Sequence, residues 1–144
     1  MSSPGDASDT LLRRVKRNHP AMTTRDPVSG RVSVQPAALR RDDGQSMSTH
    51  SAMVLATLGR ALQDVYDRTT HGSIGFPAAV PYANGAIVVH SPVSDPSEDS
   101  DPNRRDAHCD VSLADCHREV SDKVAWKLVA AAISHSAQWI QPVT

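Results

Sequence analysis

The sequence predicts an α+β fold in which a small, mostly antiparallel sheet of three to five short strands packs on two helices. Apolar side chains recur at steps of three and four residues over about 49–68 and 116–140, as they do in amphipathic helices. Short β-branched runs bounded by Gly or Pro lie outside those segments, as strands do. With 144 residues the chain has the length of one domain, which we place at 11–144.

The N-terminal third is predicted to hold a tail, short extended segments and loops. Residues 1–10 are mostly Ser, Asp, Gly and Pro, a composition typical of a disordered tail. The segment 11–17 fits either an edge strand or a turn of helix. Residues 31–39 alternate Val with polar side chains, so we expect a short strand that Pro36 ends. The polar residues 40–48 form the next predicted loop.

The central segment is predicted to be the first helix, over about 49–68. Ser48 or Thr49 offers a side-chain oxygen that suits the cap of its first turn. Gly59 weakens this helix, because glycine in a helix interior is less favourable than other ordinary residues. The following stretch, 72–85, is rich in Gly and Pro, so we expect turns and one short strand there.

The C-terminal half has the clearest pattern. Residues 85–92 are β-branched between Gly and Pro, and 107–113 alternate apolar with polar side chains, so both are predicted strands. The loop 94–106 between them changes from acidic to basic. In the helix predicted over 116–140, apolar residues fill two stripes, which indicates a largely buried helix that Pro142 stops.

Charge and hydropathy narrow the classes of protein. The formal net charge of −1 gives no general electrostatic case for binding nucleic acid or an anionic membrane. No apolar segment approaches the length that spans a bilayer, so we expect no membrane partner. The N-terminus lacks the basic and apolar regions of a secretory signal, and we expect a cytoplasmic protein with reduced thiols. A bridge between Cys109 and Cys116 remains the alternative.

Both cysteines lie in the stretch DAHCDVSLADCH, residues 106–117. A zinc site in this stretch would use His108, Cys109, Cys116 and His117. Structural zinc sites usually pair ligands two to four residues apart, whereas neighbouring residues of a strand point to opposite faces. We therefore predict no metal and no other cofactor.

The same stretch is better explained as a strand. Alternation places His108, Asp110 and Ser112 on one face and apolar side chains on the other, where Cys109 is a small buried hydrophobe. A carboxylate near an imidazole orients it, so His108 and Asp110 are the candidate catalytic pair; such pairs are also common on protein surfaces. His90, at the end of the preceding strand, is a third candidate if the two strands pair.

Basic residues occur in four pairs: Arg13–Arg14, Lys16–Arg17, Arg40–Arg41 and Arg104–Arg105. If folding brings the pairs together they form a phosphate-binding face, with Arg104 and Arg105 as the candidate phosphate-binding residues. The alternative, favoured by the sequence, is that they lie apart on solvated loops and an edge strand. No nucleophile elbow, phosphate loop or dinucleotide fingerprint occurs, and Cys116, at a helix start, has no matched base.

Several stretches together resemble a family of small bacterial proteins of uncharacterised activity. They are RNHP (17–20), SVQPAALRRDDGQSMS (33–48), GSIGFPAA (72–79), IVVHSP (87–92), DAHCDV (106–111) and AQWI (137–140). Leu39 stands where the family has an aromatic residue, and the loop before DAH is longer here. The resemblance implies a single bacterial cytosolic domain and supports the importance of His108, but it implies no particular reaction.

Three functional hypotheses follow. The absence of catalytic motifs, the Ala-rich helix with two Trp and the long charged loop favour a small non-catalytic accessory protein that binds a protein partner in a bacterial multi-gene system. The first alternative is an enzyme on nucleotides or nucleic acid, with His108 as acid or base, Asp110 orienting it, and Arg104 or Arg105 binding phosphate. The second is a small nucleic-acid-binding protein, which requires the basic pairs to share one face.

Overall fold

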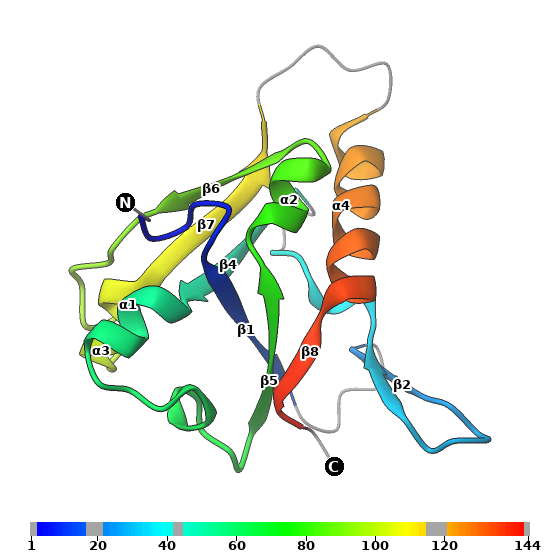
Figure 1. The fold of residues 1–144 in the computed structure, drawn as a ribbon, viewed down its shortest axis with the longest axis horizontal. Helices are drawn as coiled ribbons and strands as arrows, with labels where there is room; N and C mark the ends of the chain where they lie inside the picture. The colour runs from blue at the N-terminus through cyan, green and yellow to red at the C-terminus, as the bar shows by residue number, and fades with distance from the viewer. Residues whose placement is uncertain (1–2, 17–21, 42–44, 115–120, 143–144) are drawn as a thin grey trace.

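An antiparallel sheet of six strands forms the centre of the protein, which the computed structural model describes over residues 3–16, 22–41, 45–114 and 121–142 (Figure 1). In spatial order its strands are β6 (Ala86–His90), β7 (His108–Leu113), β4 (Ser46–Ser51), β1 (Thr10–Lys16), β5 (His71–Pro77) and β8 (Gln138–Gln141). A separate antiparallel pair is formed by β2 (Thr23–Arg25) and β3 (Val32–Val34). The predicted combination of helices with an antiparallel sheet is confirmed, but the sheet has more strands than expected.

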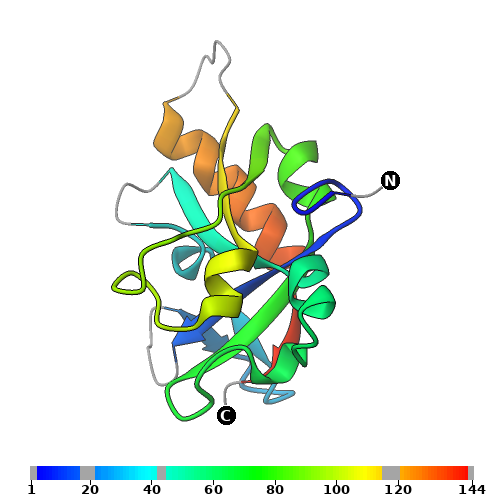
Figure 2. The ribbon, with the colours of Figure 1, turned by 90° about the vertical axis from the view of Figure 1, so that its left-hand side faces the viewer.

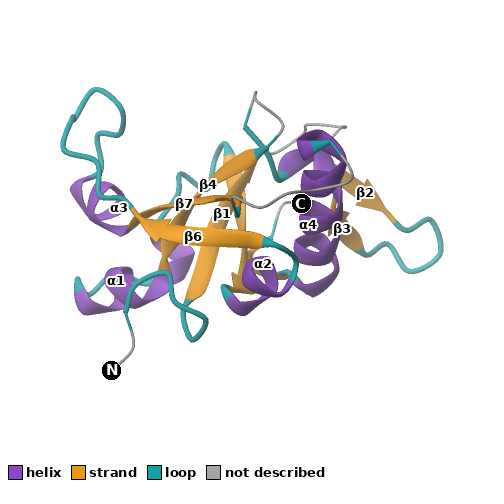
Figure 3. Cartoon of the chain, turned by 90° about the horizontal axis from the view of Figure 1, so that it is seen from above, coloured by secondary structure: helices purple, strands orange, loops and turns teal. Residues whose placement is uncertain are grey.

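Helices lie on both sides of this sheet. The helices of the described residues are α1 (Ala52–Thr57), α2 (Ala79–Ala83), α3 (Pro102–Ala107) and α4 (Asp122–Ser136), with 3-10 turns η1 (Pro36–Ala38) and η2 (Leu62–Asp64). Helix α4 lies on one side of the sheet, and α1 and α3 lie on the other (Figures 1 and 2). The view from above likewise separates α1 and α3 from α2 and α4 (Figure 3). This arrangement creates two distinct cores.

The larger core lies between α4 and the sheet. Trp126 of α4 is among the largest fully buried side chains, and its Nε1–H donates to the Leu39 carbonyl at 2.8 Å. The prediction that α4 is buried along two stripes is wrong, because Val124 and Leu128 are exposed. A helix that covers one face of a sheet needs only one apolar stripe, and its other side stays in water.

A smaller core lies on the other side of the sheet, next to α1 and α3. It consists of Leu12, Leu55, Val65, Tyr66 and Ala107. Leu11 and Leu12 are consecutive in β1 and belong to different cores, because successive side chains of a strand point to opposite faces. The central strand β1 is therefore buried on both faces at Leu11 and Leu12, and the next two residues, Arg13 and Arg14, line the cavity described below.

The helix predicted over about 49–68 is wrong for most of its length. Its first residues belong to β4, which is hydrogen-bonded to both β1 and β7. Helix α1 begins only after Ser51, whose Oγ accepts the backbone N–H of Val54, and Gly59 lies just beyond its end with a positive φ of 73°. Hydrogen-bonded pairing on both edges of β4 outweighs the helix propensity of its residues. At the other end, Gly59 adopts the left-handed backbone conformation, which ends helix α1.

Two further elements differ from the predictions. Helix α3 forms inside the predicted loop 94–106, where the Asp101 carboxylate accepts the backbone N–H groups of Asn103 and Arg104 and so caps it. The helix predicted over 116–140 begins at Asp122 among the described residues, and 115–120 lie outside them. It ends at Ser136, because the chain turns extended and pairs with β5 as β8.

Residues 3–10 are folded, so the disordered tail predicted over 1–10 is wrong for the part of it that the structure describes. Asp9 is 3% exposed, and its carboxylate accepts the backbone N–H groups of Gly5 and Met53 at 2.8 and 3.1 Å and the hydroxyl of Ser51. A buried carboxylate with several donors joins segments that are far apart in the sequence. Asp9 thereby fastens the N-terminal segment to the start of α1.

The substitution Asp9→Ala is expected to lower the free energy of unfolding by about 3 kcal/mol, because it leaves buried donors without an acceptor. Urea unfolding followed by circular dichroism measures this change. Asp6→Ala is the matched control, since the hydrogen bonds of the Asp6 carboxylate to described residues stay within its own turn, to Ser3 and Ser8. Equal stability of the Asp9→Ala protein and the wild type would contradict the role given to this carboxylate.

Candidate active site

A polar cavity of about 560 Å³ lies between β1, β4, β7 and the segment that leads into α3. Its lining residues are Arg13, Arg14, Arg41, Ser48, His50, Tyr66, Ser91, Val93, Glu98, Asp99, Arg104, Arg105, His108 and Asp110. This volume is in the range of small-molecule sites. Every lining residue except Val93 has a polar or charged side chain, so the cavity suits a charged ligand.

The register of β4 and β7 brings two histidines together in this cavity. His50 lies opposite His108, and Ser48 lies opposite Asp110. Opposed residues of an antiparallel pair point to the same face, so all four side chains line one surface. The imidazole centroids of His50 and His108 are 6.0 Å apart, with the rings at 74° to each other.

His50 is held in its neutral form. Burial, reinforced by the proximity of His108, lowers the pKa of His50 from 6.5 to about 3. Its Nδ1 lies 2.6 Å from the Tyr66 hydroxyl, which donates to the Leu12 carbonyl at 3.3 Å. We therefore assign the Nδ1–H tautomer, with Nδ1 donating to Tyr66 and the Nε2 lone pair left for a ligand.

His108 is oriented by Ser91, the residue after β6, and by Asp110 of its own strand β7. Its Nδ1–H donates to the Ser91 carbonyl at 3.0 Å, and its Nε2 lies 3.8 Å from Oδ1 of Asp110. The Ser91 hydroxyl donates to Oδ2 of Asp110 at 2.8 Å, and Arg41 forms an ion pair with the same carboxylate. Asp110 is thus fixed by two partners and in turn faces the ring of His108.

Arginines from three of the four basic pairs converge on the cavity. Among the described lining residues, five arginines face three carboxylates, an excess of two positive charges while both imidazoles are neutral. Arg41 and Arg104 form ion pairs with Asp110 and Asp99. Arg13, Arg14 and Arg105 form none within the part of the chain that is described. The positive excess therefore belongs to arginines without a carboxylate partner among the described residues, of which Arg14 is exposed.

Arg13 joins β1 to β4 where these strands separate. The two strands pair only at Leu11–Ser51 and Leu12–His50. Beyond that point the Arg13 guanidinium donates to the carbonyls of Ala38, Arg40 and Ser48 at 2.8 to 3.3 Å. Burial lowers the pKa of Arg13 to about 10, so it stays charged at neutral pH beneath the cavity.

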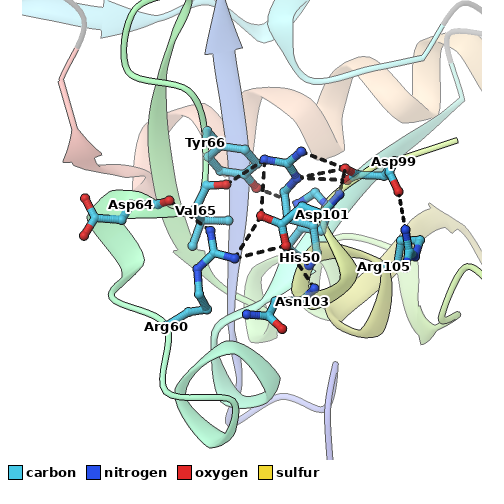
Figure 4. Close-up of polar contacts among 10 residues, drawn as sticks. His50, Arg60, Asp64, Val65, Tyr66, Asp99, Asp101, Asn103 and Arg105 are labelled. Atoms are coloured by element: carbon cyan, nitrogen blue, oxygen red, sulfur yellow. Dashed lines mark hydrogen bonds and ion pairs between the residues drawn. The ribbon is translucent and has the colours of Figure 1, made fainter. Parts of the chain in front are cut away.

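A network of ion pairs holds the wall of the cavity beside Tyr66 (Figure 4). Arg104 binds the Asp99 carboxylate through Nη2 and Nε at 2.7 and 2.9 Å and donates to the Val65 carbonyl at 2.7 Å. Hydrogen bonds from Arg104 lower the pKa of Asp99 to about 2. Arg60 binds Asp101 at 2.8 Å. These bonds tie the long charged loop and α3 to η2, and so fix the position of the tyrosine that contacts His50.

The structure brings together four of the five predicted site residues. His108, Asp110, Arg104 and Arg105 all line the cavity. His90 does not, because it pairs with Cys109 and so points to the opposite face, where its Nε2 lies 2.7 Å from the Asp106 carbonyl. The expectation that His90 approaches His108 in one cleft is wrong. His90 pairs with Cys109, the residue next to His108, so the two histidines point to opposite faces of the sheet.

Sequence reasoning missed His50 and Tyr66. His50 lies within the helix predicted over about 49–68, and Met47 is the only apolar residue of the strand Ser46–Ser51, so alternation in the sequence does not mark its cavity face. No local pattern marks Tyr66, which reaches His50 only through the fold of η2 against β1.

The cysteine of β7 takes no part in the cavity. Cys109 is fully buried in the larger core, and burial raises the pKa of its thiol to about 12, so it is unreactive. Cys116 and His117, with the bridge and the helix-start thiol considered for Cys116, lie outside the described residues. Within the described ranges no group of three His, Cys, Asp or Glu side chains is placed to hold a metal ion.

Comparisons with protein-family models, with curated proteins and with solved structures find no match to this chain. The resemblance to a small bacterial family gains no support from them. Over the residues that the structure describes, no helix is long and apolar enough to cross a membrane. The functional argument therefore depends on the geometry of the cavity.

The state of His50 predicts how stability changes with pH. The unfolded chain binds a proton at this imidazole below about pH 6.5, while the folded protein does not until about pH 3. The stabilising contribution is therefore complete above pH 6.5 and is lost as the pH falls toward 3, by about 1 kcal/mol per pH unit. Urea unfolding at pH 7 and pH 4.5 measures the loss.

His50→Gln should remove most of this acid sensitivity, because glutamine does not titrate. His135→Gln is the matched control, since His135 lies exposed on α4 at the other side of the sheet. If the His50→Gln and wild-type proteins lose the same stability between the two pH values, the buried neutral imidazole is not the cause.

Proposed function

We propose that this protein is an enzyme that breaks a phosphate-ester bond of a nucleotide or nucleic acid by general acid–base catalysis. The observation that supports this most directly is the pair of imidazoles of His50 and His108, 6.0 Å apart in a cavity with excess arginine. Cleavage of a phosphate ester needs one group to take a proton from the attacking oxygen and another to give a proton to the leaving oxygen. Two imidazoles in one anion-attracting cavity can divide these roles.

The surroundings of the two rings assign the roles. His50 is the general base, since burial keeps it neutral and its Nε2 is free to accept a proton. The negative charge of a bound phosphate next to this ring raises its pKa toward the ordinary value, which strengthens it as a base in the complex. His108 is the general acid, with Asp110 and the Ser91 carbonyl orienting its ring.

The unpaired guanidinium groups bind the phosphate. Arg14 and Arg105 line the cavity without ion pairs among the described residues. Nη1 of Arg105 donates to the Asp99 carbonyl, and the remaining N–H groups of the two side chains are the donors for the non-bridging oxygens. Arg13 adds a fixed positive charge below them. In a partly enclosed site such charges stabilise the negative charge that develops as the phosphorus–oxygen bond breaks.

The experiment is a cleavage assay of the purified protein on a panel of phosphate esters: nucleoside monophosphates, cyclic nucleotides, RNA and DNA oligonucleotides, and bis(p-nitrophenyl) phosphate. We expect turnover of at least one class, with KM raised in Arg14→Gln and Arg105→Gln proteins. Arg31→Gln serves as the matched control, because Arg31 lies outside this cavity, beside β3. Absence of turnover across the whole panel would overturn the proposal.

Binding of a protein partner, the leading expectation from the sequence, is a second candidate. It is favoured by β6, an edge strand of the sheet on which Ile87 and Val89 are 39% and 49% exposed. An edge strand with exposed apolar side chains can accept a strand of another protein. Ile87→Lys should then release a partner that co-purifies with the tagged protein, without changing phosphate-ester cleavage, because Ile87 lies opposite Ser112, which does not line the cavity. Recovery of no stoichiometric partner with the wild type would exclude this role.

A further inference from the structure

We infer that the substrate of this site is RNA and that the RNA's own 2′-hydroxyl attacks the phosphorus, an inference that rests on the proposed function. It follows from the hydroxyl groups that line the cavity, which are Ser48, Ser91 and Tyr66. Each of them is already engaged with neighbouring side chains. Among the described residues of the cavity, the protein therefore supplies an acid and a base but no nucleophile.

The two serines are unsuited to attack. Oγ of Ser48 accepts Nε and Nη2 of Arg41 at 2.9 and 2.5 Å, which occupies both of its lone pairs. The hydroxyl of Ser91 donates to Oδ2 of Asp110, and its oxygen lies 3.1 Å from Nδ1 of His108. Because Nδ1 of His108 carries the proton that it donates to the Ser91 carbonyl, it does not accept a proton from this hydroxyl. A phosphoserine intermediate is therefore not favoured on either strand.

Tyr66 is unsuited for a different reason. Its side chain is buried, and burial raises the pKa of its hydroxyl well above the ordinary value, so the phenolate is not formed. Its oxygen is held between Nδ1 of His50 and the Leu12 carbonyl. It positions the base and does not face the phosphorus. The nucleophile must therefore be water or a hydroxyl of the substrate.

The arrangement of the cavity hydroxyls favours a hydroxyl of the substrate. A water nucleophile has to be held in line with the bond that breaks, and the three described hydroxyls of the cavity are already engaged by neighbouring groups. A hydroxyl that the substrate's own covalent structure holds beside the phosphorus reaches effective concentrations of up to about 10⁵–10⁸ M. The 2′-hydroxyl of ribose is placed in this way next to the 3′-phosphodiester. DNA lacks that group.

The reaction balances with the residues of the cavity alone. Nε2 of His50 accepts the proton of the 2′-hydroxyl while the 2′-oxygen forms a bond to phosphorus. The bond from phosphorus to the 5′-oxygen breaks with its electron pair, and that oxygen takes a proton from Nε2 of His108. The products are a 2′,3′-cyclic phosphate and a 5′-hydroxyl, and the two imidazoles regain their starting protonation states by exchange with water.

The experiment compares three oligonucleotides of one sequence: RNA, RNA with 2′-O-methyl at every nucleotide, and DNA. We expect RNA to be cleaved about 10³-fold faster or more than the other two, because only RNA has the attached nucleophile. Mass spectrometry should find the upstream fragment one water lighter than a 3′-phosphate. His50→Ala protein purified in parallel should cleave RNA more slowly by about 10²-fold or more, which excludes a contaminating nuclease.

The outcomes separate this inference from the proposed function. Cleavage of DNA within tenfold of the rate on RNA, or an upstream fragment ending in a 3′-hydroxyl, would overturn the 2′-hydroxyl mechanism and leave phosphate-ester cleavage standing. Turnover of nucleoside monophosphates but not of RNA would have the same effect. Turnover of none of the esters would overturn both. A Ser48→Ala protein that loses more than 10³-fold in rate would also contradict the inference, since it would indicate a serine nucleophile.

Discussion

Replacing His50 or His108 with alanine is expected to lower kcat for phosphate-ester cleavage by about 10²–10⁴-fold, the usual contribution of a positioned general acid or base. The two rings face the same cavity, and each is held by its own partner, Tyr66 for His50 and Ser91 for His108. Because base and acid act in one step, the double variant should lose less than the product of the two single losses. Steady-state kinetics on the best substrate of the panel measures all three.

Two controls separate catalysis from folding. His135→Ala removes an exposed imidazole on α4, at the other side of the sheet, and should leave kcat unchanged. Circular dichroism of the His50→Ala and His108→Ala proteins should match the wild type at pH 7. Full activity of either variant with the fold intact would remove that imidazole from the mechanism.

Replacing Trp126 with alanine is expected to lower the free energy of unfolding by about 3–5 kcal/mol. Trp126 is 1% exposed in the larger core, and its Nε1–H satisfies the carbonyl of Leu39. Alanine leaves a cavity between α4 and the sheet and a buried carbonyl without its donor. With few aromatic side chains in the chain, no neighbour is large enough to fill the space. Urea unfolding followed by circular dichroism measures the loss.

Leu128→Ala is the matched control on the same helix. Leu128 is 63% exposed, so its truncation removes little buried surface and should change stability by less than about 1 kcal/mol. Trp126→Phe should fall between the two, because it keeps much of the apolar contact and loses the N–H. Similar stabilities of the Trp126→Ala and Leu128→Ala proteins would mean that α4 does not pack on the sheet through Trp126.

The site could be predicted from the sequence only in part, and the two strands that carry its histidines show why. His108 and Asp110 were found because alternation along 107–113 separates a polar face from an apolar one, which is a local property. His50 was missed because the neighbouring segment 49–68 also has helical spacing. Only the pairing of β4 with β1 and β7 decides against the helix, and those partners are distant in the sequence.

The position of the charged residues around the cavity could likewise not be predicted from the basic pairs of the sequence. Each pair is short and is compatible with a solvated surface, and the net charge of −1 gave no reason to expect an anion site. Folding places arginines of β1, of the segment before β4 and of α3 around one cavity. Net charge averages over the whole molecule, whereas a ligand responds to the charges within a Debye length of about 8–10 Å.

By itself the sequence determined the combination of strands and helices, the two faces of β7 and the buried stripe of α4 that contains Trp126, since each of these depends on periodicity along a continuous segment. The tertiary structure alone decided that His50 lies opposite His108 and that His90 points to the other face of the sheet. It also decided that arginines from three of the basic pairs line one cavity. Periodicity sets the side to which a residue points, but its neighbour across a sheet depends on strand order and register. Those are set by the packing of the whole chain around its two cores.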